Sequence, residues 1–418
     1  MLSGINKIKY HKIYELSLAL IAFFMLVFPK LILISILFNL LVSFLGIIKR
    51  KLVFEINLIN ILLVVLYLVY VIGLIFTNHF DIAAKCLEYK LSLLVFPIIF
   101  SFGLKTILSI KNVCVGVFLG IIILVVLGLI NSIFLYINLN TFDSFLSVNF
   151  SYIHHPTYFS SFTFLGMLLV QYAKKEEWFG QKKWIYILLF IIMLLGQCLS
   201  FSLAGVLILF IYLAFLFLKN ILKSFGRRVF LIFSIIIPFS IGIIFFNLPG
   251  LKLQVETSKK YLVEYLNDPI AFIEQDQTYI QGDETRLIMW TVAFLEFVDN
   301  PMGSGTGNIY HRLNSRLLEY GQVQLASKNY NPHNQYLQIA VEVGFFGLII
   351  FLSIIIYFIF LGIQFKNIVM VFFGLNLAFN SFFESMLERQ SGIVFFTFWI
   401  CLFTLMVFKE KSKLNHYS

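Results

Sequence analysis

The chain has 418 residues, of which 60% are hydrophobic and 12% are charged. Soluble globular domains carry about 25% charged residues, so this composition excludes a water-soluble protein. The formal net charge of +10 could suggest nucleic-acid binding. Its distribution along the chain argues against that class of function, as shown below.

Apolar runs long enough to cross roughly 30 Å of hydrocarbon recur along the whole sequence. We predict an all-α polytopic membrane protein with about twelve transmembrane helices and one large helical loop between the ninth and tenth. The expected spans are 13–29, 31–48, 57–76, 90–104, 112–137, 156–173, 184–200, 203–218, 229–248, 334–362, 367–387 and 391–408. They divide the chain into 1–248 with nine helices, the loop 249–333, and 334–418 with three helices and a tail.

The basic residues indicate the orientation of these spans. If the N-terminus is cytoplasmic, the cytoplasmic segments hold 20 of the 31 Lys and Arg residues, and the short loops on the other side hold almost none. Such a bias in short loops sets membrane topology. We therefore expect both termini in the cytoplasm, the long loop on the outer side, membrane lipids as the surroundings, and no nucleic-acid partner.

The four cysteines, Cys86, Cys114, Cys198 and Cys401, are scattered along the chain. Their spacing matches neither a metal site nor a disulfide framework. We expect no metal ligands and no cofactor.

The loop 249–333 is the only stretch able to form a substantial element outside the membrane, and loops of this length are usually functional. Leu251–Leu266 mixes apolar and charged positions, as in a helix lying on the membrane surface. Asp283 or Thr285 can cap a helix over Arg286–Asp299. A glycine-rich turn at 303–307 precedes a third helix over Ile309–Tyr320. The turn either needs positive φ angles or offers backbone N–H groups to an anion.

His333 stands at the point where this loop enters the tenth span. The positive end of a helix disfavours imidazolium, so a histidine there tends to be the neutral form that a general base needs. The alternative is an ordinary capping or interfacial histidine. Asn334 follows it, and Gly344 and Gly347 permit close helix packing in the same span.

Arg286 and Trp290 are four residues apart on one helix face, so the ring can brace the guanidinium. Arginine suits a diphosphate because its planar fork gives paired charge-assisted hydrogen bonds. The alternative is a solvated arginine paired with Asp283 or Glu284. Arg312 and Arg316 are weaker candidates of the same kind.

Further candidates lie at the spans. Glu342 and Glu384 are ionisable groups in expected spans, which are costly and point to function. Asn376 and Asn380 share a polar stripe with Glu384, and asparagines there commonly bond between helices. His155 and Tyr158 open the sixth span, where they either serve local structure or line the same outer cavity.

These motifs resemble the superfamily of O-antigen ligases and O-antigen polymerases, which assemble bacterial envelope glycans. The matching pattern is His333-Asn334, nine residues, Gly344, two residues and Gly347. Arg286 with Trp290, the Pro301 to Gly305 turn and the large late loop support the resemblance.

The resemblance implies a metal-independent glycosyltransferase of the bacterial inner membrane, with a periplasmic active site. It implies transfer of a glycan from undecaprenyl diphosphate to an acceptor hydroxyl, such as a lipid A–core sugar. His333 would be the catalytic base, and Arg286 would engage the diphosphate. Trp290, Asn334, Arg312, Arg316, Glu342, His155, Tyr158 and Arg389 are the expected substrate-binding residues.

The chain departs from the family at one position. Family members often place an arginine in a turn between spans seven and eight, where this chain has Leu203. Arg312, Arg316 and Arg389 are the alternatives for that charge. The departure leaves a repeat-unit polymerase as an alternative to a ligase. A polysaccharide-related transporter is a remoter alternative, because the inverted repeats and broken midplane helices of transporters are not evident.

Overall fold

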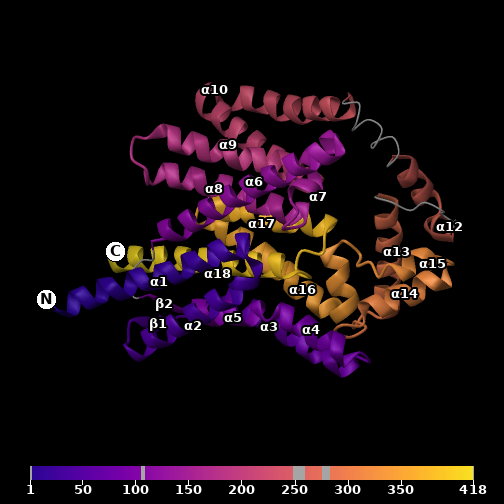
Figure 1. Cartoon of the computed structure of the whole chain (residues 1–418), viewed down its shortest axis with the longest axis horizontal. Coiled ribbons are helices and arrows are strands. Elements are labelled where there is room, and N and C mark those ends of the chain that lie inside the picture. Colours follow the sequence, from indigo (N-terminus) through magenta and orange to yellow (C-terminus); the bar gives the residue numbers. More distant parts are fainter. Residues whose placement is uncertain (1, 105–108, 248–258, 275–282, 418) are drawn as a thin grey trace.

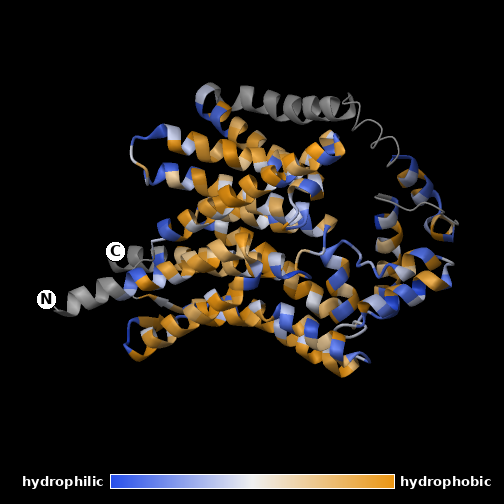
Figure 2. Cartoon of the chain, viewed as in Figure 1, coloured by the Kyte–Doolittle hydropathy of each residue, from blue (hydrophilic) through white to orange (hydrophobic). Residues whose placement is uncertain are grey.

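The structure is a computed structural model that describes residues 2–104, 109–247, 259–274 and 283–417. Long helices lie side by side, both termini lie at one end of the bundle, and the short helices α12–α15 lie at the other (Figure 1). Hydrophobic residues fill the middle of the bundle and hydrophilic ones gather at its ends (Figure 2). Within the described ranges, eight helices are long and apolar enough to cross a membrane. A polytopic all-α membrane protein is therefore confirmed.

The first part of the bundle contains α1 (Leu2–Val27), α2 (Ile32–Ile48), α3 (Leu58–Ile72) and α6 (Lys111–Leu139). A short 3₁₀ turn over Pro29–Leu31 joins α1 to α2, and a second one over Gly73–Phe76 extends α3. Helix α1 packs mainly against α6 and α2. A buried hydrogen bond of 2.7 Å from Asn39 Nδ2 to Ser17 Oγ joins α1 and α2, as expected for polar side chains between membrane helices.

The expected span at 90–104 differs from the structure. Helix α4 (Phe80–Lys90) is followed by α5 (Ser92–Ser101), which at 10 residues is shorter than the roughly 20 residues of a membrane helix. Helix α5 ends where the chain enters β2 (Phe102–Leu104), which pairs antiparallel with β1 (Leu52–Phe54). Pairing with β1 thus replaces the last turn of the expected span.

The middle of the chain contains α8 (Pro156–Lys175), α9 (Lys183–Ser200) and α10 (Leu203–Asn247), preceded by a 3₁₀ turn over Phe142–Phe145 and by α7 (Ser147–Phe150). The expected turn near Ser200 is confirmed, because Phe201 adopts a left-handed φ of 48° between α9 and α10. Gly226, with φ 82°, interrupts α10 between the expected spans 203–218 and 229–248. Helix α8 is buried along most of its length but is not among the eight apolar helices.

The last part contains α16 (Gln335–Gln364), α17 (Ile368–Phe383) and α18 (Gln390–Tyr417). Helix α18 lies in the middle of the bundle (Figure 1), where Trp399 and Phe398 are fully buried. Helices α2, α6 and α16 instead expose large apolar side chains on their outer faces, including Ile34, Ile137 and Ile356. Such an apolar exterior indicates a surface that faces lipid.

Outside the bundle, residues 259–267 are helical and are followed by α12 (Pro269–Glu274), α13 (Asp283–Asp299), α14 (Ile309–Glu319) and α15 (Val323–Ser327). The predicted helices at 286–299 and 309–320 are confirmed by α13 and α14. Residues 251–258 of the predicted surface helix lie outside the described residues. These short helices enclose an apolar cluster of their own, which includes Met289 and Leu313.

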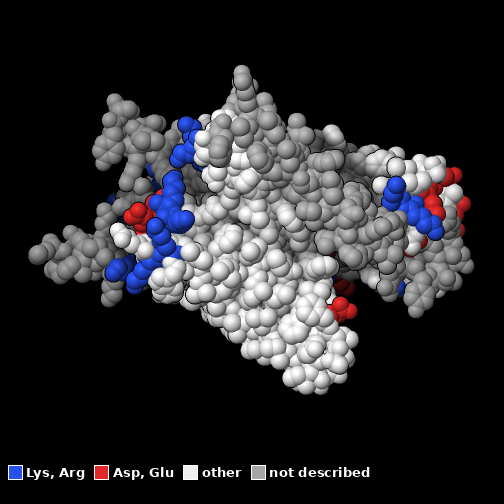
Figure 3. All heavy atoms as spheres, turned by 90° about the horizontal axis from the view of Figure 1, so that it is seen from above, with Lys and Arg blue, Asp and Glu red and all other residues white. Residues whose placement is uncertain are grey.

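Lysine and arginine side chains gather at the end of the bundle where the termini lie (Figure 3). A mixture of basic and acidic side chains marks the opposite end, at the helices outside the bundle (Figure 3). The charge bias seen in the sequence is therefore a bias between the two ends of the folded bundle.

Candidate functional site

His333 lies just before α16 and faces a carboxylate. Its Nδ1 is 3.3 Å from Glu384 Oε2, and its side chain is 29% exposed. The backbone at His333 is left-handed, with φ 46°, and its N–H donates to Asn331 Oδ1. Asn334, the next residue, caps α16 by accepting from the N–H groups of Tyr336 and Leu337. His333 thus lies outside α16, whose N-cap is Asn334, and faces the carboxylate of Glu384.

Glu384 lies beyond the end of α17 and is shared by two histidines. His155, at the start of α8, has its Nδ1 3.8 Å from the same Oε2. Burial opposes ionisation of Glu384, but the hydrogen bond and charge of His333 and the charge of His155 outweigh it and hold the pKa of this carboxyl below its usual value. Glu384 was expected on the polar stripe of a span. It instead sits in the turn that joins α17 to α18.

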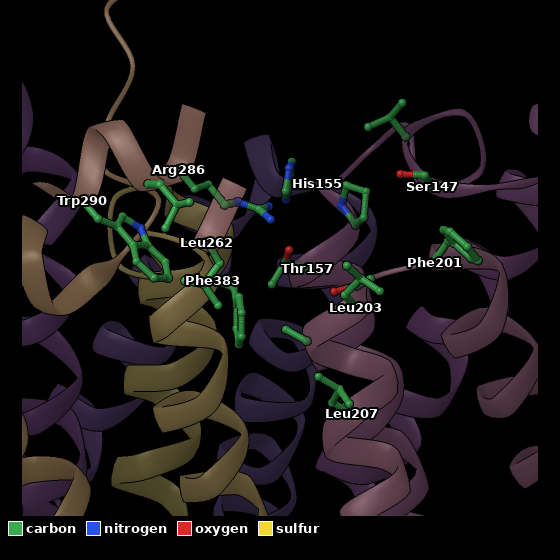
Figure 4. A pocket seen from close by; sticks show the side chains of 15 residues that line it. Ser147, His155, Thr157, Phe201, Leu203, Leu207, Leu262, Arg286, Trp290 and Phe383 are labelled. Carbon is green, nitrogen blue, oxygen red and sulfur yellow. The ribbon is translucent and has the colours of Figure 1, made fainter. Parts of the chain in front are cut away.

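A cavity of about 520 Å³ opens beside His155. It lies between α13, the α9–α10 turn, the start of α8 and Phe383 at the end of α17. In Figure 4, the guanidinium of Arg286 and the ring of His155 point into the same space, with Trp290 beside Arg286. Most of the remaining lining is apolar, as in sites that bury much of a ligand. Two residues more than 100 positions apart in sequence therefore meet at one cavity.

The positive charge of Arg286 acts on His155. Burial is the main cause that lowers the pKa of His155, the Glu384 carboxylate opposes it, and Arg389, His333 and Arg286 each lower it further. His155 is therefore within electrostatic reach of both Arg286 and His333. His333 does not belong to the described residues that line the cavity. It contacts Glu384, which in turn contacts His155 on the cavity wall.

Leu203, at the position of the family arginine, lines the same cavity from the start of α10. The α9–α10 turn that carries it is fixed by Gln197, whose amide donates to Ser160 Oγ and to the Gly205 carbonyl. A Cβ at Gly205 would overlap with the side chain of Ser160. The wall that faces Arg286 is apolar through Phe201, Leu203 and Leu207 (Figure 4).

The glycine-rich turn packs onto a break in α16. Gly344 has φ 71° and interrupts the helix, and a Cβ there would lie 2.3 Å from Met302 C. The N–H groups of Ser304 and Gly305 donate to the carbonyls of Val341 and Glu342 at 2.8 and 3.0 Å. Gly344 therefore receives the turn rather than a second helix, which corrects the helix-packing interpretation.

The same turn is not an anion site. The N–H of Thr306 donates to the Gly73 carbonyl, and the N–H of Gly307 donates to Glu342 Oε1 at 3.1 Å. With those of Ser304 and Gly305, these groups are already bonded within the protein. Of the two interpretations of the turn, the need for positive φ is the one that its geometry supports, with φ of 90°, 100° and 82° at Gly303, Gly305 and Gly307.

Glu342 lies in a buried charged cluster rather than at the cavity. Its Oε2 is 4.0 Å from Lys90 Nζ, and Cys86 Sγ donates to its Oε1. Lys90 Nζ also bonds both carboxylate oxygens of Glu388, at 2.7 and 2.8 Å. Cys86, Glu342 and Glu388 are close enough to hold a metal ion. The ammonium of Lys90 lies beside both carboxyl groups, closer to Glu388 than to Glu342.

The other candidates lie in three places. Arg316 bonds Glu296 and Asp299, and Arg312 is 3.8 Å from Glu296, so both join α14 to α13. Tyr158 is buried and donates to the Ser385 carbonyl at 3.1 Å, which steadies the turn carrying Glu384. Arg389 is exposed at the start of α18, on the His155 side.

Two features of the site were not foreseen from sequence. Lys90 stands at the edge of an apolar run, where a lysine usually reaches toward water, and Glu388 belongs to a short polar stretch between two spans. Local pattern gives no sign that the two meet across 298 positions of sequence. The pairing of His333 with Glu384 likewise depends on the fold.

Comparison with known protein families matches residues 186–352 to the family described as O-antigen ligase. The match runs from α9 through α13 and α14 into α16, so it contains Arg286, Trp290 and His333. A search of curated proteins finds no match to the chain.

Proposed function

Because the chain carries a domain of the O-antigen ligase superfamily of membrane glycosyltransferases, we propose that it transfers a glycan from undecaprenyl diphosphate to an acceptor hydroxyl. The acceptor in this proposal is a sugar of the lipid A–core. The reaction takes place at the periplasmic face of the bacterial inner membrane, with both termini in the cytoplasm. The basic end of the bundle, at the termini, supports that orientation (Figure 3).

The observation that carries the proposal is the meeting of Arg286 and His155 at one cavity beside the His333–Glu384 pair. The cavity lies between the helices outside the bundle and the ends of the spans (Figure 4). A lipid-linked donor needs such a place, because its polar head is outside the bilayer while its tail remains within. The apolar wall at Leu203 and Leu207 suits the part of the donor nearest the tail.

His333 is suited to remove the acceptor proton. The Glu384 carboxylate accepts from Nδ1–H, so Nε2 is the nitrogen that remains basic. The acceptor hydroxyl gives its proton to Nε2 while its oxygen attacks the anomeric carbon of the donor sugar. General base catalysis of this kind contributes about 10²–10⁴-fold in rate.

Arg286 is suited to stabilise the leaving group. As the bond between the anomeric carbon and the diphosphate oxygen breaks, negative charge grows on undecaprenyl diphosphate. A guanidinium already placed in a mostly apolar cavity stabilises that charge strongly. The reaction then requires no metal ion in this proposal, because the arginine supplies the charge that a metal would otherwise supply.

The alternative within the same chemistry is a polymerase that joins repeat units on the lipid carrier. Donor and reaction are the same, and only the acceptor differs. A transporter is less favoured because the cavity with Arg286 and the His333–Glu384 pair lies at the end of the bundle beside the outer helices rather than at its middle.

Analysis of surface glycolipids in a deletion strain tests the proposal. Full-length glycan chains left on the carrier support a ligase, and single repeats attached to the core support a polymerase. Unchanged glycolipids would overturn both. A purified-enzyme assay with added chelator tests metal independence, and loss of transfer that returns with a divalent metal would contradict it.

A further inference from the structure

Lys90 is a buried lysine whose ammonium holds a segment far away in the sequence. It is 1% exposed at the end of α4. Its Nζ donates to both oxygens of Glu388, lies 4.0 Å from Glu342 Oε2, and sits 4.7 Å from the centre of the Tyr70 ring. A lysine is almost never fully buried unless it is paired, so this arrangement fixes the position of its partners.

The principal partner, Glu388, belongs to the 384–389 segment that joins α17 to α18. A second residue holds the same segment: Gln335, in the first turn of α16, accepts from the Leu387 N–H at 2.5 Å and donates to Glu388 Oε1 at 3.5 Å. Gln335 is two positions after His333. The segment and the start of α16 are thus fastened together directly beside the His333–Glu384 pair.

We propose that Lys90 is a positioning residue: by holding Glu388 it fixes the 384–389 segment so that Glu384 meets His333. Lys90 touches neither substrate nor reacting atoms. The effect of losing it travels through Glu388 to Glu384. Because a displacement of about 1 Å in a catalytic group can cost on the order of 10²-fold in rate, loss of this contact has a measurable cost.

The inference rests on the proposed function for its kinetic readout, so a second readout is independent of activity. The rate at which diethyl pyrocarbonate modifies His333, resolved by peptide mass spectrometry, reports whether Glu384 still accepts from Nδ1–H. The reagent acylates the unprotonated Nε2, and the hydrogen bond at Nδ1 makes Nε2 more nucleophilic. It can be measured in the full-length protein in detergent whether or not a donor is turned over.

Three variants separate positioning from simple charge balance. Lys90→Met leaves Glu388 buried without its partner and should reduce the amount of folded protein. Lys90→Met with Glu388→Met removes the closer ion pair, leaves Glu342 as the remaining carboxyl group beside it, and should restore most of the folded protein, because a buried ion pair can be replaced by apolar residues of similar volume. Lys85→Met, on the exposed face of the same helix, is the matched control.

For the double variant we expect a kcat at least about tenfold below that of the wild type, with the donor KM changed by less than about twofold. We expect His333 to be modified more slowly than in the Lys85→Met control, because Nε2 loses the support of the Glu384 carboxylate at Nδ1–H. A double variant with wild-type kcat and wild-type modification would overturn the proposal, since Lys90 would then only balance charge. If the wild type transfers no glycan, the proposed function fails while the modification rate still decides the role of Lys90.

Should the double variant not accumulate, Glu388→Gln and Glu388→Leu provide the test. Glutamine keeps an acceptor for Lys90 and leucine does not. Positioning predicts slower turnover and slower His333 modification in Glu388→Leu than in Glu388→Gln. Equal values in the two variants would overturn it.

Discussion

His333 Nδ1 lies 3.3 Å from Glu384 Oε2, although His333 precedes α16 and Glu384 follows α17. This contact assigns the two ring nitrogens different roles, because the nitrogen that faces the carboxylate carries the hydrogen. The site therefore depends on the turn after α17 as much as on the start of α16.

Replacement of His333 by alanine should abolish glycan transfer. The variant loses the only group placed by our proposal to accept the acceptor proton, so we expect a fall of at least about 10²-fold in kcat with normal protein levels. Transfer measured with purified protein and a lipid-linked donor checks this. His311→Gln, an exposed histidine of α14, serves as the control. Turnover near that of the wild type in His333→Ala would eliminate the base assignment.

Replacement of Arg286 by lysine should remove most activity although it keeps the charge. A lysine ammonium is a point charge and cannot form the paired hydrogen bonds of a guanidinium with a diphosphate. We expect kcat/KM for the donor to fall by roughly 10²-fold, which corresponds to about 3 kcal/mol of transition-state stabilisation. Arg50→Lys, at the opposite end of the bundle, should have no effect. Retained activity in Arg286→Lys would argue against contact with the diphosphate.

Replacement of Leu203 by arginine should strengthen donor binding. The side chain of Leu203 lines the cavity into which Arg286 points, so a guanidinium there would add a second charge for the diphosphate. We expect a donor KM lower by about threefold to tenfold. Leu203→Gln, which adds polarity without charge, separates the effect of charge from that of polarity. A KM that rises in Leu203→Arg but not in Leu203→Gln would show that the diphosphate lies elsewhere.

Acid should destabilise the protein partly through His155. Its pKa in the fold is lowered from 6.5, mainly by burial. At a pH between the pKa of His155 in the fold and its value of 6.5 in the unfolded chain, the unfolded chain binds more protons than the folded one. The free energy of unfolding therefore falls as the pH drops below 6.5. The apparent Tm in detergent, followed from about pH 7 to about pH 5, should decline less in His155→Gln than in the wild type. An identical decline in both would contradict this, and His79→Gln is the matched control.

Much of the architecture could be predicted from apolar runs and turn residues. The boundary between α9 and α10 and the helices α13 and α14 follow from local sequence, because they depend on hydrophobic periodicity and backbone chemistry. The span expected at 90–104 could not be predicted correctly, since its last turn is replaced by a strand whose partner lies about 50 residues earlier.

The site was only partly predictable for the same reason. Arg286 and Trp290 share a cavity because they lie on one turn of α13, which is local information. The contacts of His333 with Glu384, and of Lys90 with Glu388, join residues 51 and 298 positions apart. Such contacts arise from tertiary packing, so the local sequence around each residue does not predict its partner.

Replacement of Gly344 by alanine should destabilise the protein more than a comparable change elsewhere. At Gly344 a Cβ meets the backbone of Met302 at 2.3 Å and the φ of 71° is unfavourable for alanine, so both strain and overlap apply. Gly321 also has a positive φ, 75°, but a Cβ there meets nothing within 4 Å. We expect a loss of about 1 kcal/mol for Gly321→Ala from backbone strain alone. For Gly344→Ala we expect at least about 3 kcal/mol, because the glycine-rich turn must also move. Thermal unfolding of the two variants in detergent measures the difference. Equal losses would mean that the turn does not pack against the break in α16 as tightly as the distances require.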